Sequence, residues 1–401
     1  MARQDRRCRP PAWNPGRLIR LLAIAGTRPE AIKLVPLARA ARLRPGIDFR
    51  LVATGQHGKP FDDVMAAFDE RVDHNLALME PGQTIDELAD LIAADLPSLA
   101  ARLQPDMILV QGDTTSAWAA ALSAVRAGVP VGHIEAGLRS HDLTRPFPEE
   151  RNRVEIDAIS TLLFAPTGQA ATNLAAEPAV TGRVVVTGNT GIDALLTMRR
   201  LTNGWTLQDS AVRTILVTCH RRENIGAGIA SVCAALRRLA ERPDVRIVLP
   251  MHPNPAVRAA VEGALGGVPR IELHPSFDYP TMVRMMDGAH LILSDSGGLQ
   301  EEAPALGVPL LVLRDNTERP EVFATGNARL VGTDADRIVA AATRLLDDPA
   351  AYAGMSLPAF PYGRGDAAER ILDAIEDWHA AYRAGHIGEA TLSYRLPPIQ
   401  A

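Results

Sequence analysis

Three acidic residues stand where successive strands of one parallel sheet would end, an arrangement suited to moving protons. Asp113 follows the third predicted strand, Glu135 follows the fourth, and Glu149 opens the next helix. Because the carboxyl ends of parallel strands meet at one edge of a sheet, we expect these carboxylates to share a cleft and to raise each other's pKa. Asp113 and Glu149 would equally serve at helix N-termini. Glu135 would equally form an ion pair with Arg139. The convergence of all three favours acid–base chemistry.

A cationic turn follows the first predicted strand. In this segment, GTRPE, Gly26 permits a tight turn and Pro29 suits the start of a helix. A helix N-terminus flanked by Arg28 and Lys33 is a good anion site. A simple strand–helix turn with solvated charges explains the segment equally well. The turn lacks the glycine pattern G-x-G-x-x-G, which argues against a nicotinamide-dependent enzyme and leaves no cofactor to expect.

The second half of the chain carries the strongest local pattern, DSGGLQEEA. Ser296, Gly297 and Gly298 follow a predicted strand and open a helix, so their backbone N–H groups would approach a phosphate closely. Glu302 lies one turn further on, where a carboxylate would accept hydrogen bonds from a ribose. Arg319 belongs to a charged loop that follows the next strand. These residues predict a nucleotide diphosphate site.

A histidine with two arginines begins another loop at the predicted cleft. His220, Arg221 and Arg222 directly follow a strand, and contact with an anion or diphosphate explains them better than a structural histidine hydrogen bond. A nucleophilic Cys219 is disfavoured, because no Cys–His–acid set with clear spacing accompanies it. The acids are dispersed among basic residues, so no metal site is expected.

These residues require a framework of parallel strands and helices. Short continuous apolar runs alternate with helical patterns, as expected of strands covered on both faces. The predicted strands are 20–25, 49–53, 107–110, 129–134, 162–165 and 184–187, then 214–218, 246–250, 270–273, 291–294, 309–313 and 329–331. The predicted helices are 30–43, 84–103, 115–127, 229–241, 254–265, 279–287, 298–306, 335–346 and a final one near 364–384.

The pattern of strands and helices starts twice, which divides the chain. We expect an α/β protein of two Rossmann-like, doubly wound domains, 18–190 and 191–363, facing a central cleft. The basic, proline-rich residues 1–17 lack the apolar run of a signal peptide, and we expect them to form a disordered tail. Residues 385–401 have weak patterning and are expected to form a second tail.

Composition narrows the class of protein. The 401 residues carry a net charge of −5 without a long basic block, which does not indicate nucleic-acid binding. No run of about 18 apolar residues predicts a membrane helix. Three cysteines are too few for a disulfide framework, which suits a reducing cytoplasm.

Taken together, the motifs closely resemble those of the non-hydrolysing UDP-N-acetylglucosamine 2-epimerases. The matching pieces occur in the family's order, from about Gly26 to Ile371, and a set of ten in order is highly specific. They are GTRPEAIKLVPL, TGQH, QGDTTS, GHIEAGLRS, PFPEERNR, GNTGIDALL, VTCHRREN, DSGGLQEEAPALG, LRDNTERPE and PYGRGDAAERI.

The resemblance implies a fold, a reaction and a set of site residues. The fold is of the glycosyltransferase-B type, with the last helix returning to the first domain. The reaction interconverts UDP-N-acetylglucosamine and UDP-N-acetylmannosamine by eliminating UDP to leave a glycal, and then adding UDP back. The implied residues are Asp113, Glu135 and Glu149 near the sugar, His220 by the diphosphate, Arg28 and Lys33 from the first domain, and Ser296, Gly297, Gly298, Glu302 and Arg319 from the second.

The family also suggests regulation and assembly. Some members bind a second UDP-N-acetylglucosamine as an activator, and Gln56, His57, Glu150 and Arg221 match part of that region. The segment MEPGQT after Leu78 lacks the arginine found in strongly regulated members, so activation stays open here. Homodimers are common in the family, and we expect one.

Four other functions are alternatives to the epimerase reaction, because a fold alone does not define activity. A retaining glycosyltransferase would need an acceptor pocket, and the motifs GTRPE and HIEAG point away from it. A hydrolysing epimerase usually carries a kinase domain, which the sequence lacks. An epimerase for a related UDP-amino sugar would have a different first motif. A catalytically inactive sensor is disfavoured because the acids and His220 are all present.

Overall fold

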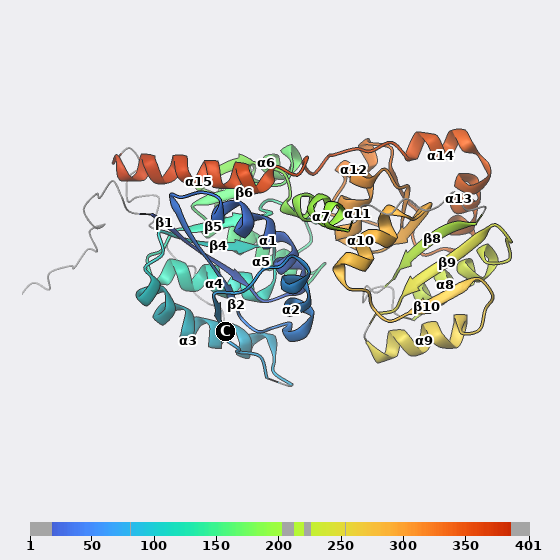
Figure 1. Ribbon diagram of the computed structural model, residues 1–401, viewed down its shortest axis with the longest axis horizontal. Coiled ribbons are helices and arrows are strands. Elements are labelled where there is room, and N and C mark those ends of the chain that lie inside the picture. Colours follow the sequence, from blue (N-terminus) through green and yellow to red (C-terminus); the bar gives the residue numbers. More distant parts are fainter. Residues whose placement is uncertain (1–17, 81, 203–211, 220–225, 253, 386–401) are drawn as a thin grey trace, which may run out of the picture.

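The computed structural model describes residues 18–80, 82–202, 212–219, 226–252 and 254–385. Two parallel sheets lie side by side along the long axis of the molecule, each covered by helices (Figure 1). This is the predicted α/β architecture of two doubly wound, Rossmann-like halves, the glycosyltransferase-B arrangement.

The first sheet has the strand order β3-β2-β1-β4-β5-β6-β7. Its strands are β1 (Ile19–Ala25), β2 (Ile47–Ala53), β3 (His74–Asn75), β4 (Met107–Gln111), β5 (Val131–Ile134), β6 (Leu162–Ala165) and β7 (Arg183–Val186). The helices of this half are α1 (Arg28–Arg42), α2 (Gly58–Ala67), α3 (Ile85–Leu103), α4 (Thr115–Arg126), α5 (Glu149–Ile159) and α6 (Gly168–Ala175). The order reverses between β1 and β4, and ligands of such sheets bind outside this switch point.

The second sheet repeats the order in the form β10-β9-β8-β11-β12-β13. Its strands are β8 (Arg213–Thr218), β9 (Val245–Pro250), β10 (Ile271–His274), β11 (Leu291–Ser294), β12 (Leu310–Val312) and β13 (Ala328–Leu330). Its helices are α8 (Ala227–Leu239), α9 (Pro255–Leu265), α10 (Tyr279–Asp287), α11 (Gly297–Leu306), α12 (Glu321–Ala324), α13 (Ala335–Asp347) and α14 (Pro349–Met355).

Strand β1 shows why its sequence reads as one continuous apolar run. Leu21 and Ala23 join an apolar cluster with α1 on one face of the sheet. Leu22 and Ile24 join a second cluster with α3 and α4 on the other face. Since successive side chains point to opposite faces, the part of a strand that is covered on both sides, here Leu21–Ala25, is apolar throughout.

Helix α7 (Thr190–Leu201) lies between the two halves (Figure 1). It packs against α1 of the first half and against α10 and α11 of the second. Ile192 and Leu195 belong to an apolar cluster that extends into both halves. The predicted domain boundary near residue 190 falls between the last strand of the first sheet and the first strand of the second. The exact residue at which the first domain ends stays a prediction.

The last helix, α15 (Ala367–Arg383), runs back over the first half (Figure 1). It packs against α1, and Trp378 is buried in the same apolar cluster. Arg44, just after α1, forms ion pairs with Glu376 at 2.6 Å and Asp373 at 2.7 Å. This is the return to the first half that the resemblance implied.

The chain therefore crosses between the halves twice, and the two crossings touch. Gly188 and Gly363 both have positive φ, at 90° and 109°. A Cβ on Gly188 would lie 3.1 Å from the Cα of Gly363, so neither position has room for a side chain. Between them, the backbone N–H of Asn189 donates to the carbonyl of Tyr362 at 2.7 Å.

Sequence patterns missed several elements and shifted several boundaries by one to three residues. The two-residue strand β3 and helices α2, α6, α7, α12 and α14 were not predicted. The strand predicted from Val129 begins at Val131, because Pro130 has no N–H to donate to the sheet. None of the helices in the described ranges combines the length and hydropathy that a membrane span requires.

Candidate active site

The cationic turn after β1 is fastened by Glu30. One oxygen of this buried carboxylate accepts the backbone N–H groups of Gly26 at 3.0 Å and Thr27 at 2.6 Å. The other accepts the hydroxyl of Thr114 at 2.7 Å, from the turn after β4. Glu30 thus ties two loops of the predicted site together. Arg28, half-buried, stands at the start of α1 beside this turn.

Glu135 is held in an unusual backbone conformation directly after β5. Its φ is +70°, in the left-handed region that residues other than glycine rarely adopt. Such strain persists where the surroundings enforce it, and it gathers at functional sites. The side chain, 6% exposed, lies at the junction of the two halves.

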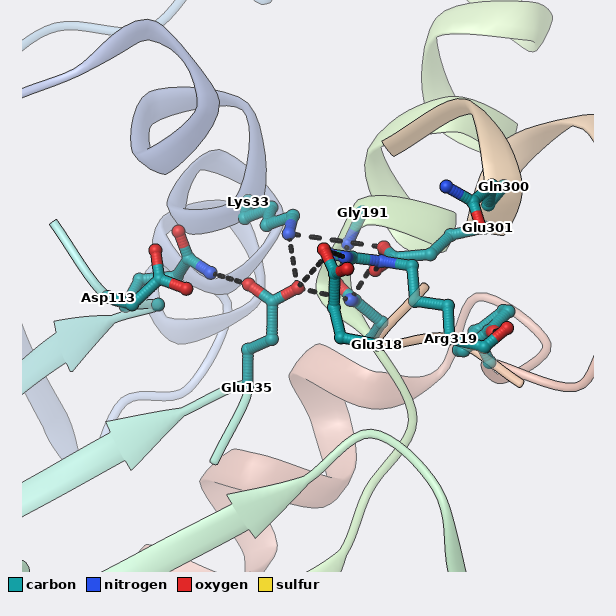
Figure 2. Close-up of polar contacts among 12 residues, drawn as sticks. Lys33, Asp113, Glu135, Gly191, Gln300, Glu301, Glu318 and Arg319 are labelled. Carbon is teal, nitrogen blue, oxygen red and sulfur yellow. Dashed lines mark hydrogen bonds and ion pairs between the residues drawn. The ribbon is translucent and has the colours of Figure 1, made fainter. Parts of the chain in front are cut away.

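The partners of Glu135 come from both halves (Figure 2). Its Oε1 lies 2.6 Å from the Lys33 ammonium, 3.1 Å from the Asn189 amide and 3.5 Å from the Arg319 guanidinium. Its Oε2 accepts a hydrogen bond from Gln111. Burial alone would raise the pKa of Glu135, but the charges of Lys33 and Arg319 hold it at about 2. The expectation of a raised pKa is wrong for Glu135, because its nearest charged neighbours are cations.

Arg139 is not the partner of Glu135. It pairs with Asp157 at 2.7 Å and with Glu177 at 2.6 Å. Asp157 also lies 2.6 Å from Nδ1 of the fully buried His133, whose Nε2 faces the carbonyl oxygen of Gly112 at 2.8 Å. This buried layer supports the loop that carries Asp113.

Asp113 is anchored to α5 instead of capping α4. Thr114 is the residue that caps α4, accepting the N–H of Ala117 at 3.0 Å. The Asp113 carboxylate pairs with Arg153, and its carbonyl accepts the Asn152 amide at 2.9 Å. Asp113 and α5 therefore move together, which links Asp113 to the helix that Glu149 begins.

Glu149 is the first residue of α5, as predicted. Its Oε2 is buried and accepts no hydrogen bond from the described part of the chain. A carboxylate oxygen in this situation is available to a ligand. The adjacent Glu150 differs, since its Oε1 accepts the backbone N–H groups of Ser140 at 2.9 Å and His141 at 3.0 Å, and its Oε2 lies 3.0 Å from the Arg153 guanidinium.

In the second half, Ser296 occupies the N-cap position of α11 and the two glycines begin the first turn of the helix. A Cβ on Gly297 would lie 2.7 Å from Nη1 of Arg319, so glycine is required for the arginine to reach across the turn. Glu302, on the same helix, accepts a hydrogen bond from the Tyr279 hydroxyl at 3.2 Å. Burial, helped by the charge of Glu301, raises the pKa of Glu302 to about 7.

Arg319 links this turn to the first half. Its guanidinium lies 2.5 Å from Glu301, 2.5 Å from Glu318 and 3.5 Å from Glu135. Lys33 lies 3.9 Å from Glu301. Cations and carboxylates of both halves therefore alternate in one buried cluster (Figure 2). Glu301 and Asn189, which completes the cluster, were not among the predicted residues.

The remaining predicted residues lie apart from this cluster. Gln56 accepts the Ser116 hydroxyl at 2.8 Å, and His57 accepts the Arg28 backbone N–H at 3.2 Å, so both lie beside the GTRPE turn. His220 and Arg221 lie outside the described residues. Within the described ranges, no group of three His, Cys, Asp or Glu side chains has the arrangement of a metal site.

A cavity of about 180 Å³ opens at the junction of the halves. Residues 138–141 and α6 line it from the first half, and Thr317, Glu318, Pro320 and Glu321 line it from the second. The carboxyl-side loops of both sheets thus meet around open space beside the charged cluster.

Residues 39–376 match the sequence model of a family described as UDP-N-acetylglucosamine 2-epimerase. The chain belongs to this epimerase family. It is 46% identical over 373 residues to a probable UDP-N-acetylglucosamine 2-epimerase of Ralstonia nicotianae, an alignment that covers 90% of this chain and 100% of the relative.

Solved structures of epimerases agree with this membership. The UDP-N-acetylglucosamine 2-epimerase of Neisseria meningitidis, bound to UDP-GlcNAc, is similar with a TM-score of 0.83 and 39% identity, covering 89% of this chain and 100% of that one. The enzyme of Methanocaldococcus jannaschii, in complex with UDP-GlcNAc and UDP, has a TM-score of 0.77 and 31% identity, covering 89% and 99%.

Asn189 and Glu301 both lie within motifs that the epimerase family shares with this chain. Asn189 is the N-cap of α7, and Glu301 stands beside Glu302, for which the sequence predicts a ribose contact. Their pairing depends on how the two halves dock, which local sequence patterns do not encode.

Proposed function

We propose that this epimerase interconverts UDP-N-acetylglucosamine and UDP-N-acetylmannosamine without net hydrolysis. The observation that carries the proposal is the meeting of two sets of residues at one junction. Carboxylate-bearing loops of the first sheet approach the first turn of α11 and Arg319 from the second. Family membership, and the relatives that bind UDP-GlcNAc, support the same substrate.

The proposed reaction proceeds in two halves. First, a carboxylate removes the proton on C2 while the C1–O bond breaks, and the bonding electrons leave with UDP. This leaves a glycal with a double bond between C1 and C2. Then a UDP oxygen attacks C1 and an acid delivers a proton to the opposite face of C2. General acid–base groups typically contribute 10²–10⁴-fold to such steps.

We assign the two proton transfers to Asp113, Glu135 and Glu149 as a group. Glu135 is ionised, as a base must be, and Glu149 has an oxygen that no described residue occupies. Lys33 and Arg319 hold the pKa of Glu135 at about 2, so Glu135 becomes an effective base as these cations shift away from it toward the diphosphate of the bound nucleotide-sugar. Departing UDP, which gains negative charge, is a suitable destination for both cations.

We assign retention of UDP to the second half and to the cationic turn. The N-terminus of α11 at Ser296, Gly297 and Gly298 suits the diphosphate. Glu302 suits the ribose hydroxyls, and Arg28 approaches from the first half. By resemblance, His220 lies near the departing oxygen. Retention matters because the glycal must meet the same UDP again before water replaces it.

Proton NMR of the protein with UDP-N-acetylglucosamine in deuterated water tests the proposal. Deuterium at C2, appearing together with UDP-N-acetylmannosamine, is the expected result. Free N-acetylmannosamine with UDP would replace the proposal by a hydrolysing reaction. An unchanged spectrum would refute it and call for other UDP-sugars and transferase acceptors.

We further propose that the enzyme is a cytoplasmic homodimer. Neither Cys219 nor Cys233 is in a disulfide, which suits a reducing compartment. Light scattering coupled to size-exclusion chromatography gives the mass directly, and a mass near the 43.0 kDa of one chain would refute the dimer.

A further inference from the structure

We propose that Asn189 is a positioning residue that ties the catalytic carboxylate Glu135 to the docking of the two domains. Its side chain bridges Glu135 of the first half and Glu301 of the second. The inference rests on the proposed function, because it treats Glu135 as a participant in the reaction.

The backbone N–H and the side chain of Asn189 together make four hydrogen bonds. The residue is 2% exposed and lies at the first chain crossing. Its backbone N–H donates to Tyr362 on the second crossing at 2.7 Å. Its Oδ1 accepts the Gly191 N–H at 2.9 Å, which caps α7 and leaves the NH₂ group on the opposite side. Both hydrogens of that group are used, one by Glu135 at 3.1 Å and one by Glu301 at 2.8 Å.

Helix capping does not explain the two donated bonds. A cap at α7 needs only the Oδ1 acceptor, which Ser, Thr or Asp also provides. The NH₂ group instead stands between two buried carboxylates that would otherwise repel. A neutral side chain with two donors satisfies both acids without adding charge. Among the residues that can cap a helix, asparagine alone offers this combination.

The contact with Glu135 has a direct geometric consequence. Glu135 has a strained backbone at φ +70°, and its Oε1 is the oxygen that receives the amide. The same NH₂ group also donates to Glu301, and the backbone N–H of Asn189 donates to Tyr362, both in the second half of the sequence. The orientation of the Glu135 carboxylate therefore depends on the relative position of the domains.

The decisive variant is Asn189→Asp. Aspartate keeps the cap on α7 but replaces both donors with acceptors. We expect kcat for epimerisation to fall about 10- to 100-fold, the effect of losing a hydrogen bond to a charged group. KM for UDP-N-acetylglucosamine and the Kd for UDP should stay within about threefold, since Asn189 contacts the carboxylates and not the α11 turn. Asn189→Ser keeps the cap without new charge and should lower kcat about 10-fold.

The double variant Asn189→Asp/Glu301→Gln distinguishes two roles of Asn189. One is to orient the Glu135 carboxylate, and the other is only to hold the two domains together. Here the glutamine amide donates to the new aspartate, so the net charge and the hydrogen bond between the domains return. We expect the urea midpoint to recover toward that of the wild type while kcat stays low, because nothing at position 189 donates to Glu135. Glu301→Gln alone completes the cycle.

Three results would overturn the inference. One is an Asn189→Asp enzyme with a kcat within threefold of wild type. Another is a double variant whose kcat recovers together with its stability, which would show that Asn189 only holds the two domains together and does not orient Glu135. If Asn189→Asp does not fold, an unchanged kcat in Asn189→Ser decides against it. Absence of turnover in the wild type would overturn the proposed function and this inference together, whereas the other results affect this inference alone.

Discussion

The substitution Glu135→Gln tests the charged cluster at its centre. Glutamine keeps the shape of the side chain and removes its charge. The pKa of Glu135 lies at about 2, against an ordinary value of 4.5. That displacement corresponds to about 3 kcal/mol in favour of the folded state at neutral pH. Removing one member of a buried ion pair typically costs about 3–5 kcal/mol, which agrees.

The stability lost in Glu135→Gln should depend on pH in a definite direction. A carboxyl group whose pKa is lowered by folding stabilises the protein fully above the unfolded value of 4.5. Its contribution declines as the pH falls from 4.5 toward 2. The stability difference between wild type and Glu135→Gln should therefore be about 3 kcal/mol at pH 7 and narrow by about 2 kcal/mol at pH 3.

Urea unfolding at both pH values measures the difference. Glu262→Gln is the matched control, because Glu262 forms an exposed i,i+4 pair with Arg258, and it should change stability by less than about 0.5 kcal/mol. In the NMR assay, Glu135→Gln should lower turnover at least about 10²-fold while UDP still binds. A difference below about 1 kcal/mol at pH 7, or one that persists at pH 3, would refute the account of the cluster. Retained turnover would remove Glu135 from the catalytic group.

Three further variants test other parts of the site and its frame. The pKa of Glu302 is raised to about 7, so its ionisation destabilises the fold as the pH rises from 4.5 through 7. Glu302→Gln, which still accepts from Tyr279, should be more stable than wild type by about 3 kcal/mol at pH 8.5 and by less than about 1 kcal/mol at pH 5. The same stability difference at both pH values would contradict the burial argument. Ser296→Trp should abolish UDP binding by calorimetry while the fold remains, because the indole fills the start of α11; normal affinity would move the diphosphate elsewhere. Gly188→Ala should lower the free energy of unfolding, measured in urea, by at least about 1 kcal/mol, because residue 188 has a φ of +90° and the new Cβ would press on Gly363. An unchanged urea midpoint would show that the two crossings separate easily.

The sequence predicted the framework well, because the framework depends on local patterns. Both faces of each central strand are covered, so runs such as Met107–Val110 are apolar throughout and mark β4 to within one residue. Helix α10 was predicted at its observed limits, Tyr279–Asp287, and the structure shows that Asp278 caps it. Two-residue β3 carries too few residues for any periodicity.

The partners of the site residues were much harder to predict. Glu135 had a candidate partner four residues away in Arg139, but it pairs with Lys33, 102 residues away. Only the folded sheet brings those two side chains together. The expectation that neighbouring acids raise the pKa of Glu135 was wrong for the same reason. The cations that surround Glu135 come from α1 and from the second half of the chain. The roles of Asp113, Glu149, Ser296 and the other proposed residues stay predictions until variants are measured.

The two touching crossings at Gly188 and Gly363 also determine the order in which the molecule can be completed during translation. Topologically, the second domain is an insertion: the chain leaves the first domain and re-enters it at almost the same point. Helix α15, which covers α1, is synthesised only after the entire second domain. The part of the α1 surface that α15 covers therefore stays uncovered until the second domain has been synthesised. Since the inserted domain begins and ends at adjacent points, its excision and replacement by a short linker would leave the path of the first domain unbroken.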